Sequence, residues 1–385
     1  MNIYSETSVQ HRRELHRRAG VGFELKETTD YIITVLRNCG YTPKNIGKSS
    51  IIAVKNGKTN EYVLLRADMD ALPIREETNL PFKSNNGCMH ACGHDMHAAM
   101  LLTAAEALAN EDTEKGTVFL FQAAEETLQG AEEILESKAL DEFNIVCCLT
   151  VHVLLGLPFK SGTVILPPSG VVAPGADVLQ LDITGKSSHG STPHLGKNAI
   201  FPSIDIIGAV NNMLNTEIPP LAFRHLNWGC IQAGNTANVV AEKAVLKCNF
   251  RYFDPDVRST AFEKIQRIVR GVALTSGCDI EFTRIGGCPP LKNDDNIIKK
   301  VKAQLSENNF DFVDAEELNS RDSNTLGGSE DFAHFSEAYP SLLLSICAGN
   351  ADSGYPMPLH TPNTDFDENA LSVGWRYFYT MAKKL

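Results

Sequence analysis

The sequence predicts an α/β protein, in which a mixed sheet with helices on both faces is interrupted by a smaller inserted α+β domain. Strand and helix patterns alternate along most of the 385-residue chain, which is typical of an α/β sheet. Proline and glycine crowd together in "PPSGVVAPGA", as they do at linkers. The chain also exceeds the roughly 250–300 residues at which single cores stop growing. We therefore expect a main domain at residues 1–172 and 286–385, and an inserted domain at residues 173–285.

The predicted main domain begins with two helices and two strands. Helical periodicity covers residues 5–20 and 27–40, and the second helix has acidic residues at its start and a glycine at its end. Apolar residues 49–54 and 61–67 are expected to form paired strands around the turn "KNGKTN". Further along the chain we expect strands at 116–124 and 143–153, a helix ending near Asn110, and a helix at 130–140.

The predicted inserted domain is a compact α+β unit with its own pattern of strands and helices. We expect strands at 177–185, 225–234, 243–253 and 278–286, and helices at 199–214 and 257–277. After this unit, helix and short-strand patterns return and continue to Leu385. The returning pattern is why we expect the main domain to be built from two separate parts of the chain.

Composition narrows the classes of partner. The net charge is −12 and the isoelectric point is about 5.4, which argues against nucleic acid or an anionic membrane as the main partner. No apolar run approaches the ~18 residues of a membrane span. The ten cysteines are scattered, and the polar start of the sequence lacks the pattern of a secretory signal. We therefore expect a cytoplasmic protein with reduced thiols, and the negative charge does not oppose a small anionic substrate, because a local basic pocket can lie on an acidic protein.

The segment "MHACGHDMHAAM" concentrates metal-binding side chains at the start of a predicted helix. Within nine positions it contains His90, Cys92, His94, Asp95 and His97. The spacing of the three histidines places them on one face of a helix, and a surface helix rarely needs such a cluster. The segment therefore predicts a metal site, although on its own it is also compatible with a structural histidine cluster.

Other metal-capable residues follow the ends of predicted strands, with one more in a downstream loop. These residues are Asp68 and Asp70, Glu125 and Glu126, His152, and His360 in "MPLHTPNTDFDE". Taken singly, each has an ordinary alternative, such as a helix cap, a solvated acidic pair or a hydrogen-bonded core histidine. Open α/β sheets, however, build their ligand crevice at the carboxyl ends of the strands. Together these groups predict a centre for two metal ions.

These motifs also carry a resemblance to a known family. The chain resembles the dinuclear-metal amidohydrolases and carboxypeptidases, a family that includes aminoacylase, hippurate hydrolase, indoleacetic acid–amino acid hydrolase and N-acetyl-diaminopimelate deacetylase. Six blocks match in the family's order and cover nearly the whole chain: "LLRADMDALPI", "MHACGHDMHAAMLL", "LFQAAEET", "SSHGSTPHLGKNAI", "GSEDFAHF" and "LHTPNTDFDE". Because the blocks are ordered, the resemblance is far more specific than any single motif.

The resemblance implies a role for each matching residue of the centre. The implied metal ligands are Cys92, His94, Glu126, His152 and His360, holding two divalent ions such as Zn, Mn, Co or Ni. Glu125 matches the general base, and Asp70 is expected to orient a ligand. Most relatives carry His-x-Asp where this chain has Asp68-x-Asp70, so the role of Asp68 is left open. His90 and His97 are expected to support the loop and the helix start.

The resemblance also implies a shared site between two subunits. His189 in "KSSHGSTPH" matches a residue that stabilises the oxyanion in the partner subunit, so a homodimer through the inserted lid and dimerisation domain is expected. Asn238 and Arg251 lie in blocks that recognise the substrate carboxylate, for which arginine is well suited. Glu330 and Asp331 belong to a block that lines the site. Without the resemblance, these would be ordinary loop or surface residues.

The expected activity is therefore metal-dependent hydrolysis of the amide bond of N-acyl-L-amino acids with acetyl or aromatic acyl groups. A dipeptidase or carboxypeptidase would use the same centre, and so would a specific deacetylase of N-acetyl-diaminopimelate or N-acetyl-cysteine. A non-catalytic metal-binding relative is an alternative of another class, but the chain keeps the expected base, Glu125. A thiol redox protein is disfavoured because no C-x-x-C motif occurs.

Overall fold

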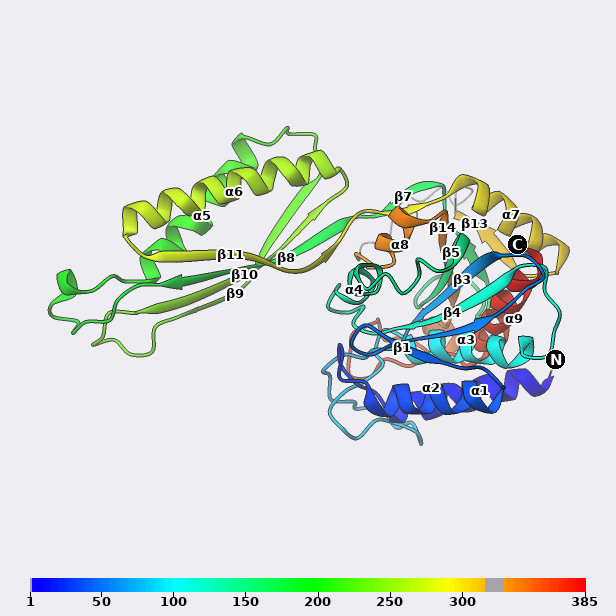
Figure 1. Cartoon of the computed structure of the whole chain (residues 1–385). Coiled ribbons are helices and arrows are strands. Elements are labelled where there is room, and N and C mark those ends of the chain that lie inside the picture. The colour runs from blue at the N-terminus through cyan, green and yellow to red at the C-terminus, as the bar shows by residue number, and fades with distance from the viewer. Residues whose placement is uncertain (1, 316–327) are drawn as a thin grey trace. The chain divides into compact units, whose positions relative to one another are not determined.

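The computed structural model describes residues 2–315 and 328–385, and these divide into two compact units. The first unit contains residues 2–172, 291–315 and 330–385, and the second contains Ala173–Pro290 with residues 328–329. Each unit has its own hydrophobic core. Figure 1 colours the second unit green to yellow, because its residues fall along the sequence between the two main parts of the first unit.

The first unit contains most of the helices and strands that the structure describes. Its helices are α1 (Asn2–Arg17), α2 (Lys26–Asn38), α3 (His94–Leu108), α4 (Gly130–Glu136), α7 (Asp295–Glu307), α8 (Ala333–Ala338), α9 (Asn369–Lys384) and the 3-10 turn η3 (Ala351–Ser353). Its strands are β1 (Lys44–Ile46), β2 (Ser50–Lys55), β3 (Glu61–Asp68), β4 (Gly116–Gln122), β5 (Asn144–Leu154), β6 (Val164–Leu166), β12 (Leu291–Asn293), β13 (Phe312–Asp314) and β14 (Ser341–Cys347), while β7 (Gly170–Ala173) spans the boundary between the units.

The large sheet of the first unit is mixed, as the sequence predicted. Its strand order is β1-β2-β4-β3-β5-β14-β6-β13. Strands β4, β3, β5 and β14 run parallel, whereas β2 and β6 are antiparallel to their neighbours in this group. The predicted pairing of β2 with β3 is wrong, because β4 lies between them. Since α3 connects β3 to β4 as a crossover helix, those two strands become parallel neighbours, and the short turn does not form a hairpin.

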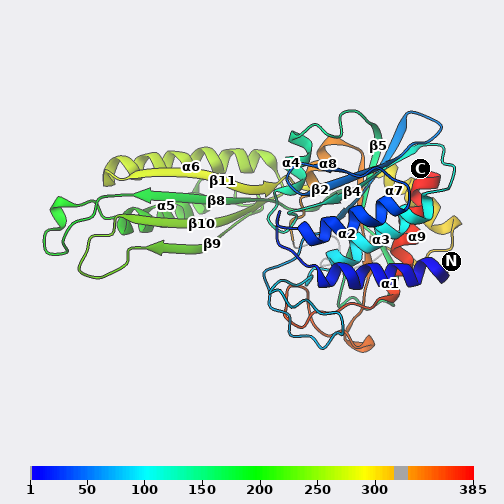
Figure 2. The ribbon, with the colours of Figure 1, turned by 60° about the horizontal axis from the view of Figure 1, so that its bottom comes forward.

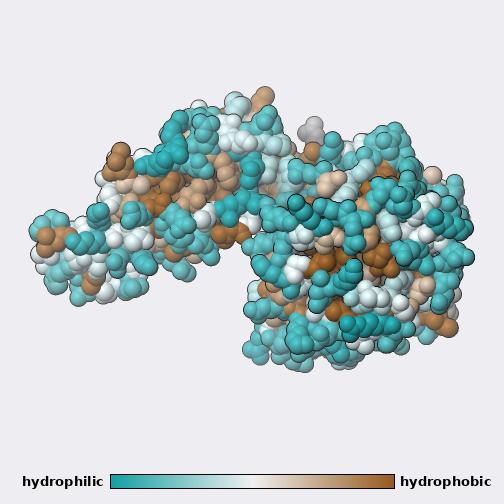
Figure 3. Space-filling view, in the orientation of Figure 1, coloured by the Kyte–Doolittle hydropathy of each residue, from teal (hydrophilic) through white to brown (hydrophobic). Residues whose placement is uncertain are grey.

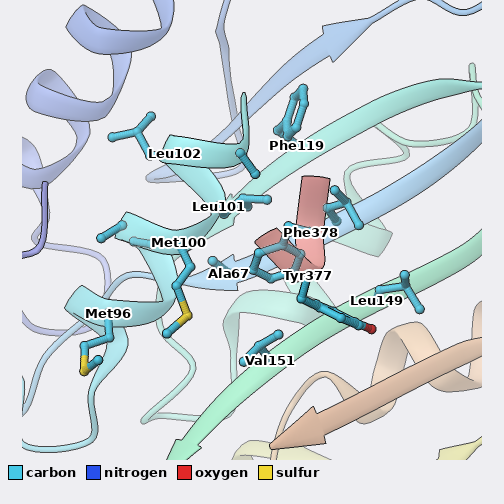
Figure 4. Packing of buried hydrophobic residues seen from close by; sticks show 14 of the residues in the cluster. Ala67, Met96, Met100, Leu101, Leu102, Phe119, Leu149, Val151, Tyr377 and Phe378 are labelled. Atoms are coloured by element: carbon cyan, nitrogen blue, oxygen red, sulfur yellow. The ribbon is translucent and has the colours of Figure 1, made fainter. Parts of the chain in front are cut away.

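Helix α3 lies at the centre of the first core, where all of its residues except Glu106 are buried. Met96, Met100 and Leu101 of α3 pack against β3, β4 and β5 and against Tyr377 and Phe378 of α9 (Figure 4). Helices α1, α2, α3 and α9 lie on one face of the sheet, and α4 and α8 lie on the other (Figures 1 and 2). This packing fixes the N-terminus of α3, where the histidine-rich segment enters the fold.

The second unit is an antiparallel sheet with helices on one face. Its strands β8 (Gly175–Thr184), β9 (Arg224–Ala233), β10 (Lys243–Tyr252) and β11 (Asp279–Cys288) are ordered β11-β8-β10-β9. Its helices are α5 (Ile200–Thr216), α6 (Pro255–Ser276) and the 3-10 turn η1 (Pro193–Leu195). Alternate residues of β8, such as Leu179 and Leu181, join residues of both helices in the core. Strand β9 forms one edge of this sheet.

Apolar side chains reach the surface mainly on the second unit. Within residues 2–315 and 328–385, large exposed apolar residues there include Phe201 and Ile204 of α5, Ile231 of β9, Leu221 and Leu274. Figure 3 shows brown, hydrophobic residues at the surface of this unit. Helical spacing puts Phe201 and Ile204 on the same face of α5. A search of the described residues finds no helix with the length and apolar character needed to span a membrane.

Candidate metal centre

The metal-capable residues converge where the parallel strands of the first unit end. Strand β3 ends at Asp68, His152 lies near the end of β5, and the loop after β4 carries Glu125. Gly93, immediately before α3, has φ +88°, and a Cβ there would lie 2.4 Å from Val153 Cγ2. Only glycine therefore lets the loop that carries Cys92 approach β5 this closely.

Cys92 lies at the middle of the five predicted ligands. Its Sγ is 3.6 Å from His152 Nε2 and 3.3 Å from His360 Nε2. Glu126 Oε1 lies 3.7 Å from His360 Nε2 and 3.9 Å from His94 Nε2. The five residues form two groups, and within each group the possible ligand atoms lie within 4.8 Å of one another. One group is Cys92, His94 and His152, and the other is Cys92, Glu126 and His360. The thiol belongs to both groups, which is the arrangement expected between two neighbouring ions.

Two of the histidines are held with one nitrogen directed into the centre. His94 Nδ1 lies 2.9 Å from the Asp70 carbonyl oxygen, and His152 Nδ1 lies 2.7 Å from the Val153 carbonyl oxygen. A carbonyl oxygen only accepts hydrogen bonds, so each Nδ1 carries the proton and donates. In the neutral ring, the Nε2 atom of each histidine therefore carries the lone pair that a metal ion would use. Fixing the ring of a metal ligand through its other nitrogen is the usual arrangement in metalloproteins.

The centre contains buried polar atoms that a cation would satisfy. Within residues 2–315 and 328–385, neither His94 Nε2 nor Glu126 Oε1 has a hydrogen-bond partner, and both are buried. Such orphaned atoms are rare in folded proteins and call for a bound group. A thiolate, imidazoles and carboxylates are donors that bind zinc and similar transition-metal ions. The side chain of His360 is 51% exposed, so the centre is open on that side.

Burial sets the protonation of the ligands. Burial lowers the pKa of His152 to about 3, with nearby His97 adding to the effect, so its imidazole is neutral at physiological pH and can bind a metal. Burial lowers the pKa of His94, but the charges on Asp68 and Cys92 outweigh it and raise the pKa above the ordinary value. Burial raises the pKa of the Cys92 thiol well above its ordinary value. A bound cation reverses that effect and favours the thiolate.

Glu125 lies beside the ligands but also belongs to a cluster of acids. Its Oε2 is 3.8 Å from His94 Nε2, and its carboxylate groups with those of Glu330 and Asp331. Burial raises the pKa of Glu125 well above its ordinary value, and the negative charges of Glu330 and Asp331 raise it further. A carboxylate with a raised pKa is a stronger base than an ordinary one, which suits it to accept a proton during catalysis.

Asp70 holds the two neighbouring glutamates in place. Its carboxylate accepts hydrogen bonds from the backbone amides of Glu125, at 3.1 Å, and Glu126, at 3.2 Å, while its carbonyl oxygen accepts the bond from His94. Ala124, just before the pair, has φ +58°, a left-handed conformation that costs a non-glycine residue energy. The bonds to Asp70 hold the loop in this conformation and so position both glutamates.

Arg66 is a buried member of the site that sequence reasoning missed. Its Nη1 donates to Asp68, and its Nη2 donates to Glu330 and Asp331, at 2.7, 3.0 and 2.9 Å respectively. Its Nε donates to Gln122 at 2.9 Å. The guanidinium therefore partly offsets the charge of the buried acidic cluster beside Glu125, the predicted base. The signal was present in the sequence, because "YVLLRAD" places an arginine inside an otherwise apolar strand.

His189 of the second unit is held as a hydrogen-bond donor. Its Nδ1 accepts a hydrogen bond from the Ser191 amide at 3.1 Å, so its proton lies on Nε2. The neighbouring Gly190 amide donates to the Asn238 carbonyl oxygen at 2.8 Å, and Asn238 Oδ1 accepts from Thr236 at 2.9 Å. Hence His189 and Asn238 lie on adjacent loops, where an Nε2–H group and an amide NH₂ group can donate to a ligand.

The structure does not bring Arg251 near this pair. In the antiparallel sheet, Arg251 is paired with Ala176 at the start of β8, whereas Lys243 is paired with Thr184 at the end from which the chain continues to His189. Eight residues along β10 correspond to roughly 26 Å. Arg251 instead lines a cavity of about 680 Å³ with polar neighbours that include His225, Asn227 and Asn249. The two predicted carboxylate-binding residues, Asn238 and Arg251, therefore lie at opposite ends of one sheet.

Comparison with known proteins agrees with this architecture. Residues 64–384 match the model of peptidase family M20/M25/M40. The chain is 32% identical to the N-acetyl-L-cysteine deacetylase of Bacillus subtilis over 97% of this chain and 87% of the relative. It is 29% identical to the hippurate hydrolase of Campylobacter jejuni over 97% of this chain and 95% of the relative.

A solved structure gives the same result for the fold. The dinuclear metal-binding M20 peptidase of Bacillus subtilis superimposes with a TM-score of 0.75 at 26% identity, covering 99% of this chain and 98% of that chain. The family match covers far more than half of the sequence, and the fold and the candidate metal-ligand groups agree with it. The chain belongs to peptidase family M20/M25/M40 and is a hydrolase of that family.

Proposed function

We propose that the protein hydrolyses the amide bond of N-acyl-L-amino acids carrying an acetyl or aromatic acyl group. The observation that carries the proposal is the placement of Glu125, a buried carboxylate with a raised pKa, beside the cluster centred on Cys92. Relatives named as an N-acetyl-L-cysteine deacetylase and a hippurate hydrolase support this substrate class. A dipeptidase or carboxypeptidase activity would use the same residues on the same kind of bond.

The proposed centre holds two divalent cations, for which Zn, Mn, Co and Ni are the candidates. Cys92, His94, Glu126, His152 and His360 would hold them. When bound, such ions supply Lewis-acid polarisation of the amide carbonyl and acidify a water molecule. Glu125 takes the proton from the attacking water and passes it to the leaving amine. Asp70 keeps Glu125 and Glu126 in position through their amides.

The second unit supplies the contacts to the rest of the substrate in this proposal. His189 donates its Nε2–H to the oxyanion that develops when water attacks the carbonyl carbon. Arg251 binds the carboxylate of the amino acid, because its guanidinium matches a carboxylate in shape and charge. Asn238 offers a second donor beside His189. Together these contacts would make a free carboxylate a requirement for rapid turnover.

We propose that the active form is a homodimer. A single N-acyl amino acid cannot span the roughly 26 Å of β10 between Arg251 and the loops of His189 and Asn238. A second copy supplying His189 and Asn238 resolves the conflict. Exposed Phe201 and Ile204 on α5 and the edge strand β9 support self-association through this unit.

We place the enzyme in the cytoplasm on the evidence of its thiols. All ten cysteines lie in the described parts of the chain, and all are free. Free thiols in this number fit a reducing compartment better than an oxidising one. The proposed partners are the small substrate and a second copy of the chain, with no nucleic acid and no membrane.

The proposal is tested by measuring amine release from a panel of acetyl, benzoyl and indoleacetyl amino acids, N-acetyl-diaminopimelate and dipeptides. Wild type and Glu125→Gln are compared after loading with Zn, Mn, Co or Ni. We expect turnover by the wild type and a loss of about 10²–10⁴-fold in kcat for Glu125→Gln, with metal content unchanged. Faster cleavage of dipeptides than of all N-acyl amino acids would replace this function by a dipeptidase. Absence of turnover across the panel would refute the proposal.

A further inference from the structure

A buried chain of hydrogen bonds runs from β3 to the end of β5 through helix α3. Arg66 Nη1 donates to Asp68 Oδ2 at 2.7 Å, and the other carboxylate oxygen, Oδ1, lies 2.6 Å from His97 Nδ1. The Val153 amide donates to His97 Nε2 at 2.8 Å. Arg66, Asp68 and His97 are each no more than 1% exposed, so water does not compete for these bonds.

These hydrogen bonds fix the position of the ring proton of His97. Because the Val153 amide is a donor, His97 Nε2 must accept with its lone pair. The ring proton therefore lies on Nδ1 and is donated to Asp68. Asp68 and His97 are close enough to His94 to form a possible ligand group. However, both nitrogens of His97 are already occupied, and so are both oxygens of Asp68.

The last residue in this row of hydrogen bonds is Val153, which orients the predicted ligand His152. The Val153 carbonyl oxygen accepts the hydrogen bond from His152 Nδ1 at 2.7 Å, while the Val153 amide is tied to His97. Val153 is thus held at its amide and holds His152 at its carbonyl. Since His152 directly precedes Val153 in β5, a shift of this backbone would move His152 Nε2 away from Cys92.

We propose that Asp68 and His97 are positioning residues that fix His152 for metal binding, and that neither binds the metal itself. The inference rests on the proposed metal centre and gives a role to the acid that replaces the expected histidine at position 68. Asp68 orients His97, His97 holds the Val153 backbone, and that backbone orients His152. Arg66 holds Asp68 in place from the other side.

Two substitutions of His97 separate a positioning role from a ligand role. His97→Gln keeps one donor and one acceptor, so the bonds to Asp68 and Val153 can re-form, whereas His97→Phe removes both. Zn²⁺ is titrated into the metal-free full-length proteins, and the affinity of each binding step is measured by calorimetry. We expect one step to weaken by about 10–100-fold in His97→Phe. The same step should stay within about threefold of wild type in His97→Gln.

A matched control and a second variant keep the test decisive. Thr150→Val removes a buried hydrogen bond from the same strand, between Thr150 Oγ1 and the Arg66 carbonyl oxygen, and should leave Zn²⁺ affinity unchanged. Asp68→Asn has one acceptor oxygen for two donors, so it should weaken the same step as His97→Phe. If His97→Phe does not fold, Asp68→Asn and His97→Gln carry the comparison.

The possible outcomes are distinct. Equal weakening of Zn²⁺ binding in His97→Gln and His97→Phe would mean that His97 binds the metal directly. Wild-type affinity in both Asp68→Asn and His97→Phe would mean that these hydrogen bonds do not position His152. Either result overturns the inference. A wild-type protein that binds no Zn²⁺ would overturn both the inference and the proposed centre. Zn²⁺ binding that follows the expected pattern in an enzyme that cleaves no N-acyl amino acid would refute only the proposed function.

Discussion

Asp70 shows how one residue can hold several members of the predicted centre in place. Its side chain holds the amides of Glu125 and Glu126, and its carbonyl oxygen holds His94. Consecutive residues of one loop would otherwise be free to rotate their side chains away from the centre. Because Asp70 is fully buried, its bonds are not weakened by competing water, and a small change at this residue should have a large effect.

We expect Asp70→Asn to lower kcat/KM by about 10–100-fold, as is usual when a residue supporting metal ligands is changed. Asparagine keeps the shape and the backbone carbonyl but has only one side-chain oxygen for the two amides. Steady-state kinetics on the best N-acyl amino acid measures the loss, and circular dichroism checks that the variant is folded. Wild-type kcat/KM in a folded variant would show that these bonds do not position Glu125.

The sequence predicted which residues form the centre, but not the hydrogen bonds between them. Cys92, His94 and Glu125 stand out from motifs, and their roles stay predictions that the metal titrations and kinetics above test. Arg66 and the tautomer of His97 are different, because they depend on contacts between segments far apart in the chain. Such contacts have no local pattern, so the sequence offers only the hint of a charge inside an apolar strand.

At the scale of elements, α1 is tied to the start of α3 by a buried charged histidine. His16 Nδ1 lies 2.8 Å from Asp95 Oδ2, and its Nε2 lies 3.1 Å from Glu76 Oε2. Burial lowers the pKa of His16, but the hydrogen bonds to Asp95 and Glu76 outweigh it and raise the pKa to about 9. The first helix thus stabilises the segment that carries Cys92 through an ionic contact.

This contact makes stability depend on pH in a defined direction. The folded-state pKa of His16, about 9, exceeds its ordinary value of 6.5. Its contribution is therefore complete below about pH 6.5 and is lost as the pH rises through about 9, a loss of up to about 3 kcal/mol. Urea unfolding between pH 6 and 10 measures the fall. The decline over this range should be shallower in His16→Gln, and equal slopes in the two proteins would contradict the assignment.

The contact between α3 and α9 leaves no room at Gly374. A Cβ at this position would lie 2.1 Å from Met100 Sδ, so Gly374→Ala should lower the free energy of unfolding by about 1–3 kcal/mol. Gly271→Ala in α6 is the matched control, because nothing lies within 4 Å of its Cβ, and it should be neutral or slightly stabilising. Denaturant unfolding of both variants checks this, and equal stability of the two would disprove the packing argument.

The elements that sequence reasoning missed are the short ones. Strands β1, β6, β12 and β13 have three residues each, too few to show a periodic pattern. The long strands and helices up to β11 were located because their periodicity extends over several turns or alternations, whereas α7, β14 and α9 were expected only as a returning helix and short-strand pattern. The pairing of β2 was predicted wrongly because its partner, β4, lies about sixty residues further along the chain and a nearby turn favoured β3.

At the scale of the whole molecule, a shared site predicts that two inactive variants restore each other. His189→Ala lacks the proposed donor of the second unit, and Glu125→Gln lacks the proposed base of the first. Dimers that combine them contain one intact site of two, so the unfractionated product of equal co-expression should recover about a quarter of wild-type activity, and the isolated mixed dimer about half. The measurement uses two affinity tags to isolate the mixed dimer.

The control for this experiment combines two variants of the first unit. A mixed dimer of Glu125→Gln and His94→Ala has no intact site, because both residues belong to the same centre, and it should stay inactive. Recovery of activity in this control would show that the activity comes from something other than a site shared between two subunits. An inactive mixture of His189→Ala and Glu125→Gln would show that each chain works with its own His189.

The overall class of the molecule could be predicted because it depends on average properties. Alternating strands and helices predict the mixed α/β sheet, and the proline- and glycine-rich stretch marks the change to the α+β pattern. The distance between Arg251 and His189 could not be predicted in the same way. It follows from the register of β8 against β10, and register depends on side chains that meet only in the folded sheet.

The separation of Cys92 and His360 along the chain bears on how the protein is made. The two side chains meet at 3.3 Å but are 268 residues apart in the sequence. At ordinary rates of translation, the ribosome needs on the order of tens of seconds to add the intervening residues. During that time the nascent chain contains Cys92 and the other predicted histidine ligands but not yet His360. The complete centre is thus a late product of synthesis, and a chain truncated before His360 cannot assemble it.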